Sequence, residues 1–159
     1  MVGDSLLESA IDEVTQALGG DTVRVDALAG RTIGQAGDAI TALAANAPHV
    51  AIISLGTNDV DTDPGLLRAD IEATAGVLRQ LPCVIWVDAQ PFTPALDALN
   101  MELRAVAASS ANLHVATWSN LAGPADLHSA DGYHLSEEGQ LAFANLVATA
   151  VSLFCGAEG

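Results

Sequence analysis

Apolar segments of strand length alternate with amphipathic helical patterns along the whole chain. The segments 50–55 (VAIISL) and 83–87 (CVIWV) are almost continuously apolar, which is typical of parallel strands covered on both faces. Short strands that alternate with helices predict an α/β domain built on a parallel sheet. The sequence contains no internal repeat or linker that would divide this pattern. We therefore predict a single three-layer domain over residues 1–159.

The helical segments place apolar residues at spacings of three and four, so each helix has one apolar face. They predict helices near residues 7–18, 36–47, 67–78, 96–106 and 137–154. Two further strands are expected, at 22–27 and 113–117. Ser136 is expected to cap the last helix, because a serine hydroxyl can accept hydrogen bonds from the free N–H groups of the first turn.

Composition and charge exclude several classes of function. Half of the 159 residues are hydrophobic and 16% are charged, which suits a chain with a buried core. The net charge of −15 repels phosphate backbones and anionic lipid, so we expect no nucleic-acid partner and no binding to a membrane surface. No apolar run approaches the roughly 18 to 20 residues of a membrane-spanning helix, so we expect no membrane insertion by this domain.

The two cysteines, Cys83 and Cys155, leave the cellular compartment open. They do not form a C-x-x-C pair, so the sequence gives no sign of a zinc or redox motif. Both can be buried thiols, since one begins an apolar strand and the other ends the last helical pattern. A disulfide that ties the last helix to the sheet is the alternative.

A candidate nucleophile, Ser5, lies in the segment 3–6 (GDSL), where the first strand is expected to end and the first helix to begin. A serine at such a turn exposes its hydroxyl beside the free N–H groups of the helix start. The simpler interpretation is an ordinary helix cap. Asp4 is expected to fix the turn through backbone hydrogen bonds, and we give it no chemical role.

A candidate general base, His134, follows Asp131 at a spacing of three in a late loop. An imidazole titrates near neutral pH and can accept the Ser5 proton, while a carboxylate can hold the other ring nitrogen. The same spacing also fits a plain surface turn, and Asp126 with His128 forms a rival pair. Two other histidines precede or open strands at the opposite end of the sheet and are expected to be structural: His49 and His114.

Asn58 follows the strand 50–55 in the segment 56–59 (GTND) and is a candidate donor to an oxyanion, together with the backbone N–H groups of Gly30 and Ser5. A β-turn is the simpler interpretation of this segment, since it favours glycine, asparagine and aspartate. All of these groups follow strands or lie in late loops, and ligands of open parallel sheets bind at the carboxyl ends of the strands. We therefore expect one site at that edge.

Metal and phosphate chemistry have no support in the sequence. There is no H-E-x-x-H or comparable ligand cluster, and the segment 30–34 (GRTIG) matches neither a phosphate-binding loop nor a dinucleotide fingerprint. We expect neither a metal nor another cofactor.

Four segments resemble, in order, the four signature blocks of the SGNH (GDSL-type) hydrolases: 3–6, 29–31, 56–59 and 131–136. The resemblance covers almost the whole chain and implies a flavodoxin-like sheet with the strand order 2-1-3-4-5. It also implies a catalytic triad and an oxyanion hole. The triad is Ser5, Asp131 and His134, and the oxyanion hole is formed by Ser5, Gly30 and Asn58.

Two details refine the resemblance. The strand before the first block is longer in the family, and here only Met1 and Val2 precede it, so we expect a truncated first strand and a native chain that extends upstream. Trp86 and Trp118 give the second half a likeness to SGNH domains fused to membrane acyltransferases that modify cell-envelope glycans. Together these points favour an extracytoplasmic domain, secreted or tethered to an upstream membrane region, over a cytoplasmic one.

The expected activity is that of a serine esterase that hydrolyses short acyl esters, such as acetyl groups on a sugar, through an acyl-enzyme. A shallow site is expected because the chain has few insertions, with Phe92, Leu121 and Tyr133 as candidate walls. Two alternatives stay open: an O-acyltransferase that moves the acyl group to a glycan hydroxyl, and a non-catalytic binding domain. The sequence leaves the natural substrate and the oligomeric state undetermined.

Overall fold

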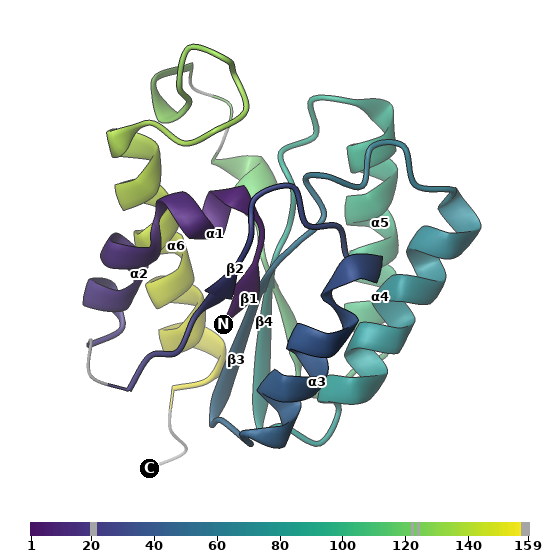
Figure 1. Cartoon of the computed structure of the whole chain (residues 1–159). Helices are drawn as coiled ribbons and strands as arrows, with labels where there is room; N and C mark the ends of the chain where they lie inside the picture. The colour runs from purple at the N-terminus through teal and green to yellow at the C-terminus, as the bar shows by residue number, and fades with distance from the viewer. Residues whose placement is uncertain (20–21, 122, 124, 157–159) are drawn as a thin grey trace.

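A five-stranded parallel sheet forms the centre of the computed structural model, which describes residues 1–19, 22–121, 123 and 125–156 (Figure 1). The strands lie in the order β2-β1-β3-β4-β5, so the predicted α/β class and strand order are both confirmed. Their bounds are β1 Val2–Gly3, β2 Asp26–Ala27, β3 Val50–Ser54, β4 Cys83–Val87 and β5 Leu113–Ala116.

Helices cover both faces of the sheet and make it the middle of three layers (Figure 1). One face carries α1 Ser5–Ser9, α2 Ile11–Ala17 and α6 Glu137–Phe154. The other face carries α3 Gly37–Ala45, α4 Pro64–Leu78 and α5 Pro94–Ala108. Three single-turn 3₁₀ helices lie in the connections: η1 Gly34–Ala36, η2 Trp118–Asn120 and η3 Ala125–Leu127.

Burial on both faces explains the apolar runs of the two longest strands. Neighbouring residues of a strand point to opposite faces, so Ile53 and Trp86 pack with α3, α4 and α5, whereas Ile52 and Ile85 pack with α1, α2 and α6. Trp86 is fully buried, and its indole N–H donates to the carbonyl of Leu55 at 3.0 Å. That hydrogen bond satisfies the one polar atom that the ring brings into the core.

Polar caps fix the starts of the long helices. The side chains of Asp63 and Thr93 accept backbone N–H groups at the starts of α4 and α5, and a proline follows each of them. Ser136 caps α6 by accepting the Gly139 N–H at 3.0 Å, as the sequence predicts.

Two elements differ from the sequence prediction. The expected helix at 7–18 is broken at Ala10, which leaves helical geometry with φ −109° and separates α1 from α2. The expected strand at 22–27 pairs only at Asp26 and Ala27, because its neighbour β1 offers only Val2 and Gly3 as partners.

A cavity lies near the two-residue strand β1. β1 lies between β2 and β3 and pairs with β3 only at Ile53 and Ser54. The cavity, of about 440 Å³, lies at the amino end of the sheet, with Met1, Val50 and Ile52 in its lining. The Met1 ammonium donates to the carbonyl of Arg24 at 2.6 Å, and burial lowers its pKa.

A disulfide joins Cys83 at the start of β4 to Cys155 directly after α6. Of the two interpretations that the sequence left open, buried thiols and a disulfide, the structure thus has the disulfide. The bond closes a separation of 72 residues, and the two Cα atoms are 5.7 Å apart. It lies at the amino end of β4, whereas the loop before α6 lies beyond the opposite end of the sheet (Figure 1). Within the described ranges, no helix combines the length and the apolar character needed to cross a bilayer.

Candidate active site

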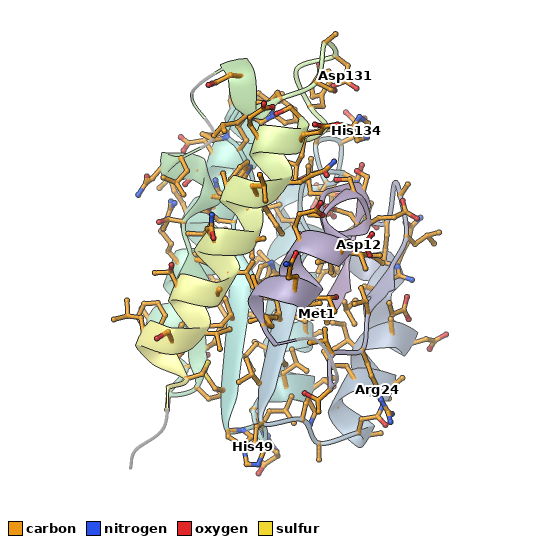
Figure 2. The ribbon with its side chains drawn as sticks, turned by 90° about the vertical axis from the view of Figure 1, so that its left-hand side faces the viewer. Met1, Asp12, Arg24, His49, Asp131 and His134 are labelled. Atoms are coloured by element: carbon orange, nitrogen blue, oxygen red, sulfur yellow. A yellow bond between two sulfur atoms is a disulfide. The ribbon has the colours of Figure 1, made fainter. Side chains whose placement is uncertain are left out.

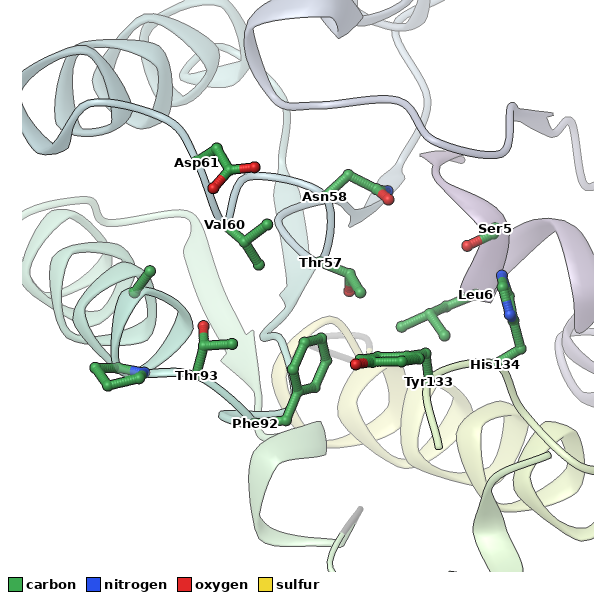
Figure 3. Close-up of a pocket in the computed structure, with 12 residues that line it drawn as sticks. Ser5, Leu6, Thr57, Asn58, Val60, Asp61, Phe92, Thr93, Tyr133 and His134 are labelled. Carbon is green, nitrogen blue, oxygen red and sulfur yellow. The ribbon is translucent and has the colours of Figure 1, made fainter. Parts of the chain in front are cut away.

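The loops at the carboxyl ends of β1, β3 and β4 and the loop before α6 meet around a cavity of about 610 Å³ (Figure 3). This volume lies in the range of small-molecule sites. Ser5, Asn58 and His134 all line it, although they come from three distant parts of the chain. The structure therefore brings together three of the four side chains that the sequence assigned to one site, and the fourth, Asp131, contacts His134.

The backbone delivers Ser5 to the cavity through a tight strand-to-helix turn. Gly3 lies so close to α1 and β3 that a Cβ atom in its place would be 2.6 Å from the Cβ of Leu7 and 3.1 Å from the carbonyl oxygen of Ser54. The N–H of Asp4 donates to that same Ser54 carbonyl at 2.9 Å. Glycine at this position thus allows α1 to begin directly after β1 while β1 lies close against β3.

Asp4, and not Ser5, caps α1. Its Oδ1 accepts the N–H of Leu6 at 3.0 Å, and Ser5 is the first residue of the helix. The interpretation of Ser5 as an ordinary helix cap is therefore wrong, and its hydroxyl is not occupied with capping. Figure 3 shows the Ser5 hydroxyl at the cavity.

Asp131 orients the imidazole of His134. Its Oδ2 lies 2.7 Å from Nδ1 of the ring, and its Oδ1 accepts the backbone N–H groups of Tyr133 and His134 at 2.8 and 3.0 Å. The hydroxyl of Ser129 donates to Oδ1 as well, at 2.7 Å. The bond to His134, followed by these others, holds the pKa of Asp131 well below its usual range, so the carboxyl group is anionic.

An anionic partner at Nδ1 leaves Nε2 of His134 as the unprotonated nitrogen of the neutral ring. Figure 3 shows the ring turned toward Ser5. Within the described residues no hydrogen bond joins the two side chains, and such catalytic bonds often tighten only when substrate binds. This arrangement can support proton transfer between the Ser5 hydroxyl and Nε2.

Asn58 is held beside the Ser5 turn by two acceptors. Its side-chain nitrogen donates to the carbonyl of Arg31 at 3.2 Å and to Oδ2 of Asp4 at 3.4 Å. The loop reaches this position through Gly56, whose φ of +131° favours glycine, and a Cβ atom in its place would lie 3.1 Å from the side chain of Leu99.

Gly30 lies in the loop whose Arg31 carbonyl accepts from Asn58, with a φ of +77° that favours glycine. It is exposed and is not among the described residues that line the cavity. Of the three expected oxyanion donors, Ser5 and Asn58 therefore line the cavity and Gly30 does not.

An aromatic pair forms one wall of the cavity. The rings of Phe92 and Tyr133 meet edge to face with their centres 4.8 Å apart, and both line the cavity as the sequence suggested (Figure 3). Leu121, the third expected wall, is not among the described lining residues. Thr57, Asp61 and Thr93 also line the cavity, although they were not predicted from the sequence. The only sequence signal for the first two was their place in the loop that carries Asn58.

The other histidines are accounted for elsewhere. The ring of His128 lies edge to face with Trp118, with centres 6.3 Å apart, and neither His128 nor Asp126 is among the described lining residues. Figure 2 shows His49 at the end of the molecule opposite His134. His114 stacks on Phe154 with ring centres 4.7 Å apart.

Acidic groups dominate the charge around the cavity. Asp61 is exposed in its lining, and no arginine is among the described lining residues. Asp4 and Asp59, the chain neighbours of the lining residues Ser5 and Asn58, are buried, and burial raises the pKa of both carboxyl groups, that of Asp4 to about 7. In the described part of the chain, no three His, Cys, Asp or Glu side chains are grouped so that they could hold a metal ion.

Comparisons with known proteins find a matching family model and several solved structures of similar fold. The sequence model of the GDSL-like Lipase/Acylhydrolase family matches residues 2–142. No match was found among curated proteins. Among solved structures, the catalytic domain of peptidoglycan O-acetyltransferase A from Streptococcus pneumoniae is 19% identical, with a TM-score of 0.79 over 96% of this chain and 90% of that one.

Two other solved structures share the fold. The family 3 carbohydrate esterase of Clostridium thermocellum is 20% identical, with a TM-score of 0.75 over 99% of this chain and 96% of that one. The psychrotrophic esterase EstA from Pseudoalteromonas sp. is 16% identical, with a TM-score of 0.75 over 98% and 97%. At these identities the likeness establishes the fold alone.

Proposed function

Because this chain belongs to the GDSL-like lipase/acylhydrolase family, we propose that it is a serine esterase with Ser5 as nucleophile, His134 as general base and Asp131 as the partner of the base. One observation carries the proposal. Ser5 and His134 line the same cavity, and the nitrogen of His134 remote from Asp131 is the one left to accept a proton.

The reaction proceeds in two steps. Nε2 of His134 takes the proton of the Ser5 hydroxyl as Oγ bonds to the ester carbonyl carbon. The resulting oxyanion accepts hydrogen bonds from the Asn58 side chain and from the backbone N–H group of Ser5, the two expected donors that line the cavity. The C–O bond to the alcohol then breaks, and His134 gives its proton to the leaving oxygen. A water that His134 deprotonates attacks the acyl-enzyme, which releases the acid and restores Ser5.

The substrate class is a short acyl ester, of the acetyl type, on a carbohydrate or another alcohol. The cavity of about 610 Å³ is much larger than an acetyl group, so most of it is available to the alcohol. The exposed face of Tyr133 beside Phe92 offers an apolar wall for a ring such as that of a sugar. A carbohydrate esterase among the structural neighbours supports this choice.

An O-acyltransferase is the second candidate, because the fold is shared with a peptidoglycan O-acetyltransferase domain. A glycan hydroxyl would then replace water in the second step, and His134 would deprotonate it in the same way. A non-catalytic binding domain is the third candidate.

An extracytoplasmic location is part of the proposal. The disulfide between Cys83 and Cys155 supports it, since disulfides form and persist in oxidising compartments.

The test is hydrolysis of p-nitrophenyl acetate by the wild type and by Ser5→Ala, together with labelling by a fluorophosphonate probe and mass spectrometry of the labelled peptide. Ser9→Ala is the matched control, since Ser9 lies in the same helix and its hydroxyl donates to the Leu6 carbonyl outside the cavity. We expect turnover and a label on Ser5 in the wild type and in Ser9→Ala, and neither in Ser5→Ala. A folded wild type without turnover or label would instead favour the binding domain, and product analysis with a glycan acceptor separates hydrolase from transferase.

A further inference from the structure

Asp4 is a buried acid that the proposed mechanism does not use. It is completely buried and directly precedes the proposed nucleophile. Two other aspartates are as deeply buried, and each has a structural task. Asp59 accepts the N–H of Ile33 at 3.1 Å, and Asp88 binds Arg104 at 2.6 Å together with Ser119.

The carboxyl group of Asp4 joins the two segments from which the proposed nucleophile and the proposed oxyanion donor come. Oδ1 accepts the N–H of Leu6 in α1 at 3.0 Å, and Oδ2 accepts the side-chain nitrogen of Asn58 at 3.4 Å. The backbone N–H of Thr57 also bonds to this carboxyl group. A single side chain therefore links the start of α1 to the loop after β3.

The surroundings of Asn58 determine which end of its amide faces inward. The two hydrogens of its nitrogen point to Oδ2 of Asp4 and to the carbonyl oxygen of Arg31. A reversed amide would place its own oxygen against both of those oxygens, which is repulsive. Both contacts are longer than the 2.9–3.0 Å that is most common for N–H···O bonds. The amide is thus oriented without being tightly bound.

Capping alone does not account for an aspartate at this position. Serine or asparagine caps a helix about as well, without placing a carboxyl group in the interior. Burial of this group is unfavourable for its charged form, and the raised pKa reflects that cost. The second contact, to Asn58, is what an aspartate oxygen adds beyond the cap.

We propose that Asp4 is a positioning residue of the oxyanion hole, whose carboxyl group holds the Asn58 amide with its nitrogen toward the nucleophile. The N–H that Asn58 shares with Asp4 in the resting enzyme turns to the substrate oxygen as negative charge develops there. This inference rests on the proposed function and adds to it a residue that never touches the substrate.

A double-mutant cycle tests the inference, with kcat and KM for p-nitrophenyl acetate measured in the wild type, Asp4→Asn, Asn58→Ala and the double variant. Asp4→Asn keeps a capping oxygen but turns a donor toward the Asn58 nitrogen. We expect it to lower kcat by about tenfold or more with KM nearly unchanged, and by no more than the roughly 10²–10³-fold that complete removal of an oxyanion donor typically costs. In the Asn58→Ala background, the same change is expected to alter kcat by less than about twofold.

Two results would contradict the proposed role of Asp4. An equal loss in both backgrounds, or no loss of kcat in Asp4→Asn, would show that Asp4 does not act through Asn58. Asp88→Asn is the matched control, because it neutralises another buried carboxyl group that is outside the cavity lining, and it is expected to change the melting temperature but not kcat. If Asp4→Asn does not fold, Asp4→Ser keeps a capping hydroxyl and enters the same cycle.

Failure of this inference can be distinguished from failure of the proposed function. An active, fluorophosphonate-labelled wild type with additive losses overturns only the role of Asp4. A folded wild type that neither turns over ester nor labels at Ser5 overturns the proposed function and this inference with it.

Discussion

Asp131 binds His134 twice: Oδ2 contacts the ring nitrogen Nδ1 at 2.7 Å, and Oδ1 accepts the backbone N–H of the same residue at 3.0 Å. The position of the ring and the conformation of the loop are therefore set by one carboxylate three residues away. The proposed base and its partner need no other part of the fold to find each other. Only the approach of this loop to Ser5 depends on long-range packing.

The first prediction concerns that carboxylate. Asp131→Asn keeps an acceptor for the backbone N–H groups of Tyr133 and His134, but it presents an amide donor to Nδ1 and favours the wrong tautomer of the ring. We expect kcat for p-nitrophenyl acetate to fall by about 10⁴-fold, as for comparable changes in other triads. Circular dichroism should show unchanged folding, and a variant with nearly full activity would remove Asp131 from the proposed triad.

The second prediction concerns stability and pH. The pKa of Asp4 is raised to about 7 by burial, so the folded state binds its proton more tightly than the unfolded state does. The free energy of unfolding should therefore fall as the pH rises from about 4 to about 7, and Asp59 and Asp88, whose pKa values are also raised by burial, act in the same direction.

Urea unfolding between pH 4 and pH 8 measures this effect. Relative to Asp4→Asn, the wild type is expected to lose roughly 4 kcal/mol over that range, from a pKa difference of about three units. Parallel stability curves for the two proteins would contradict the assignment.

The third prediction concerns the disulfide. Removal of the bond between Cys83 and Cys155 frees a loop of 72 residues in the unfolded state, and the chain-entropy relation gives a loss of about 4 kcal/mol in the free energy of unfolding. We expect the variant with both cysteines replaced by alanine to melt at a lower temperature while kcat changes by less than about twofold, because the bond lies outside the cavity lining. A reducing agent should lower the melting temperature of the wild type and leave that of the double variant unchanged.

The fourth prediction concerns the charge of the substrate. Asp61 is exposed in the cavity lining, so an anionic acyl group should be disfavoured there. We expect kcat/KM for the mono-p-nitrophenyl ester of succinic acid to be lower than kcat/KM for p-nitrophenyl butyrate. Asp61→Asn is expected to reduce the ratio of these two kcat/KM values by about two- to fivefold at low salt. Added salt should have a similar effect on the wild type. Asp38→Asn makes the same charge change on α3, outside the described lining, and should leave the ratio unaltered.

Much of the fold could be predicted because the local sequence patterns favour the same helices and strands that the packing of the whole domain requires. The two strands with apolar runs are covered on both faces, and Ser136 begins the last helix as the sequence suggests. The break at Ala10 could not be predicted, since the apolar spacing of residues 7–18 continues through it. The disulfide could not be chosen from the sequence either, because it depends on the 5.7 Å separation of two distant Cα atoms.

Part of the candidate site could likewise be predicted from the sequence, and part could not. Ser5, Asn58 and His134 could be placed together because each follows a strand or precedes the last helix, and parallel strands end at a common edge. Thr93 lines the cavity through the packing of the loop before α5, which no spacing in the sequence reveals. The contact between Asp4 and Asn58 was missed because it joins residues 54 positions apart, and each of them has an ordinary turn or capping explanation.

The covalent link at Cys155 is far from the mouth of the 610 Å³ cavity, since β4 begins at one edge of the sheet and the proposed nucleophile lies at the other. If the protein were immobilised on a resin through a residue engineered directly after Cys155, it would be attached at the end of the molecule remote from the cavity. The rim that carries the proposed catalytic residues would then face the bulk liquid, where even an insoluble polymer particle could reach it.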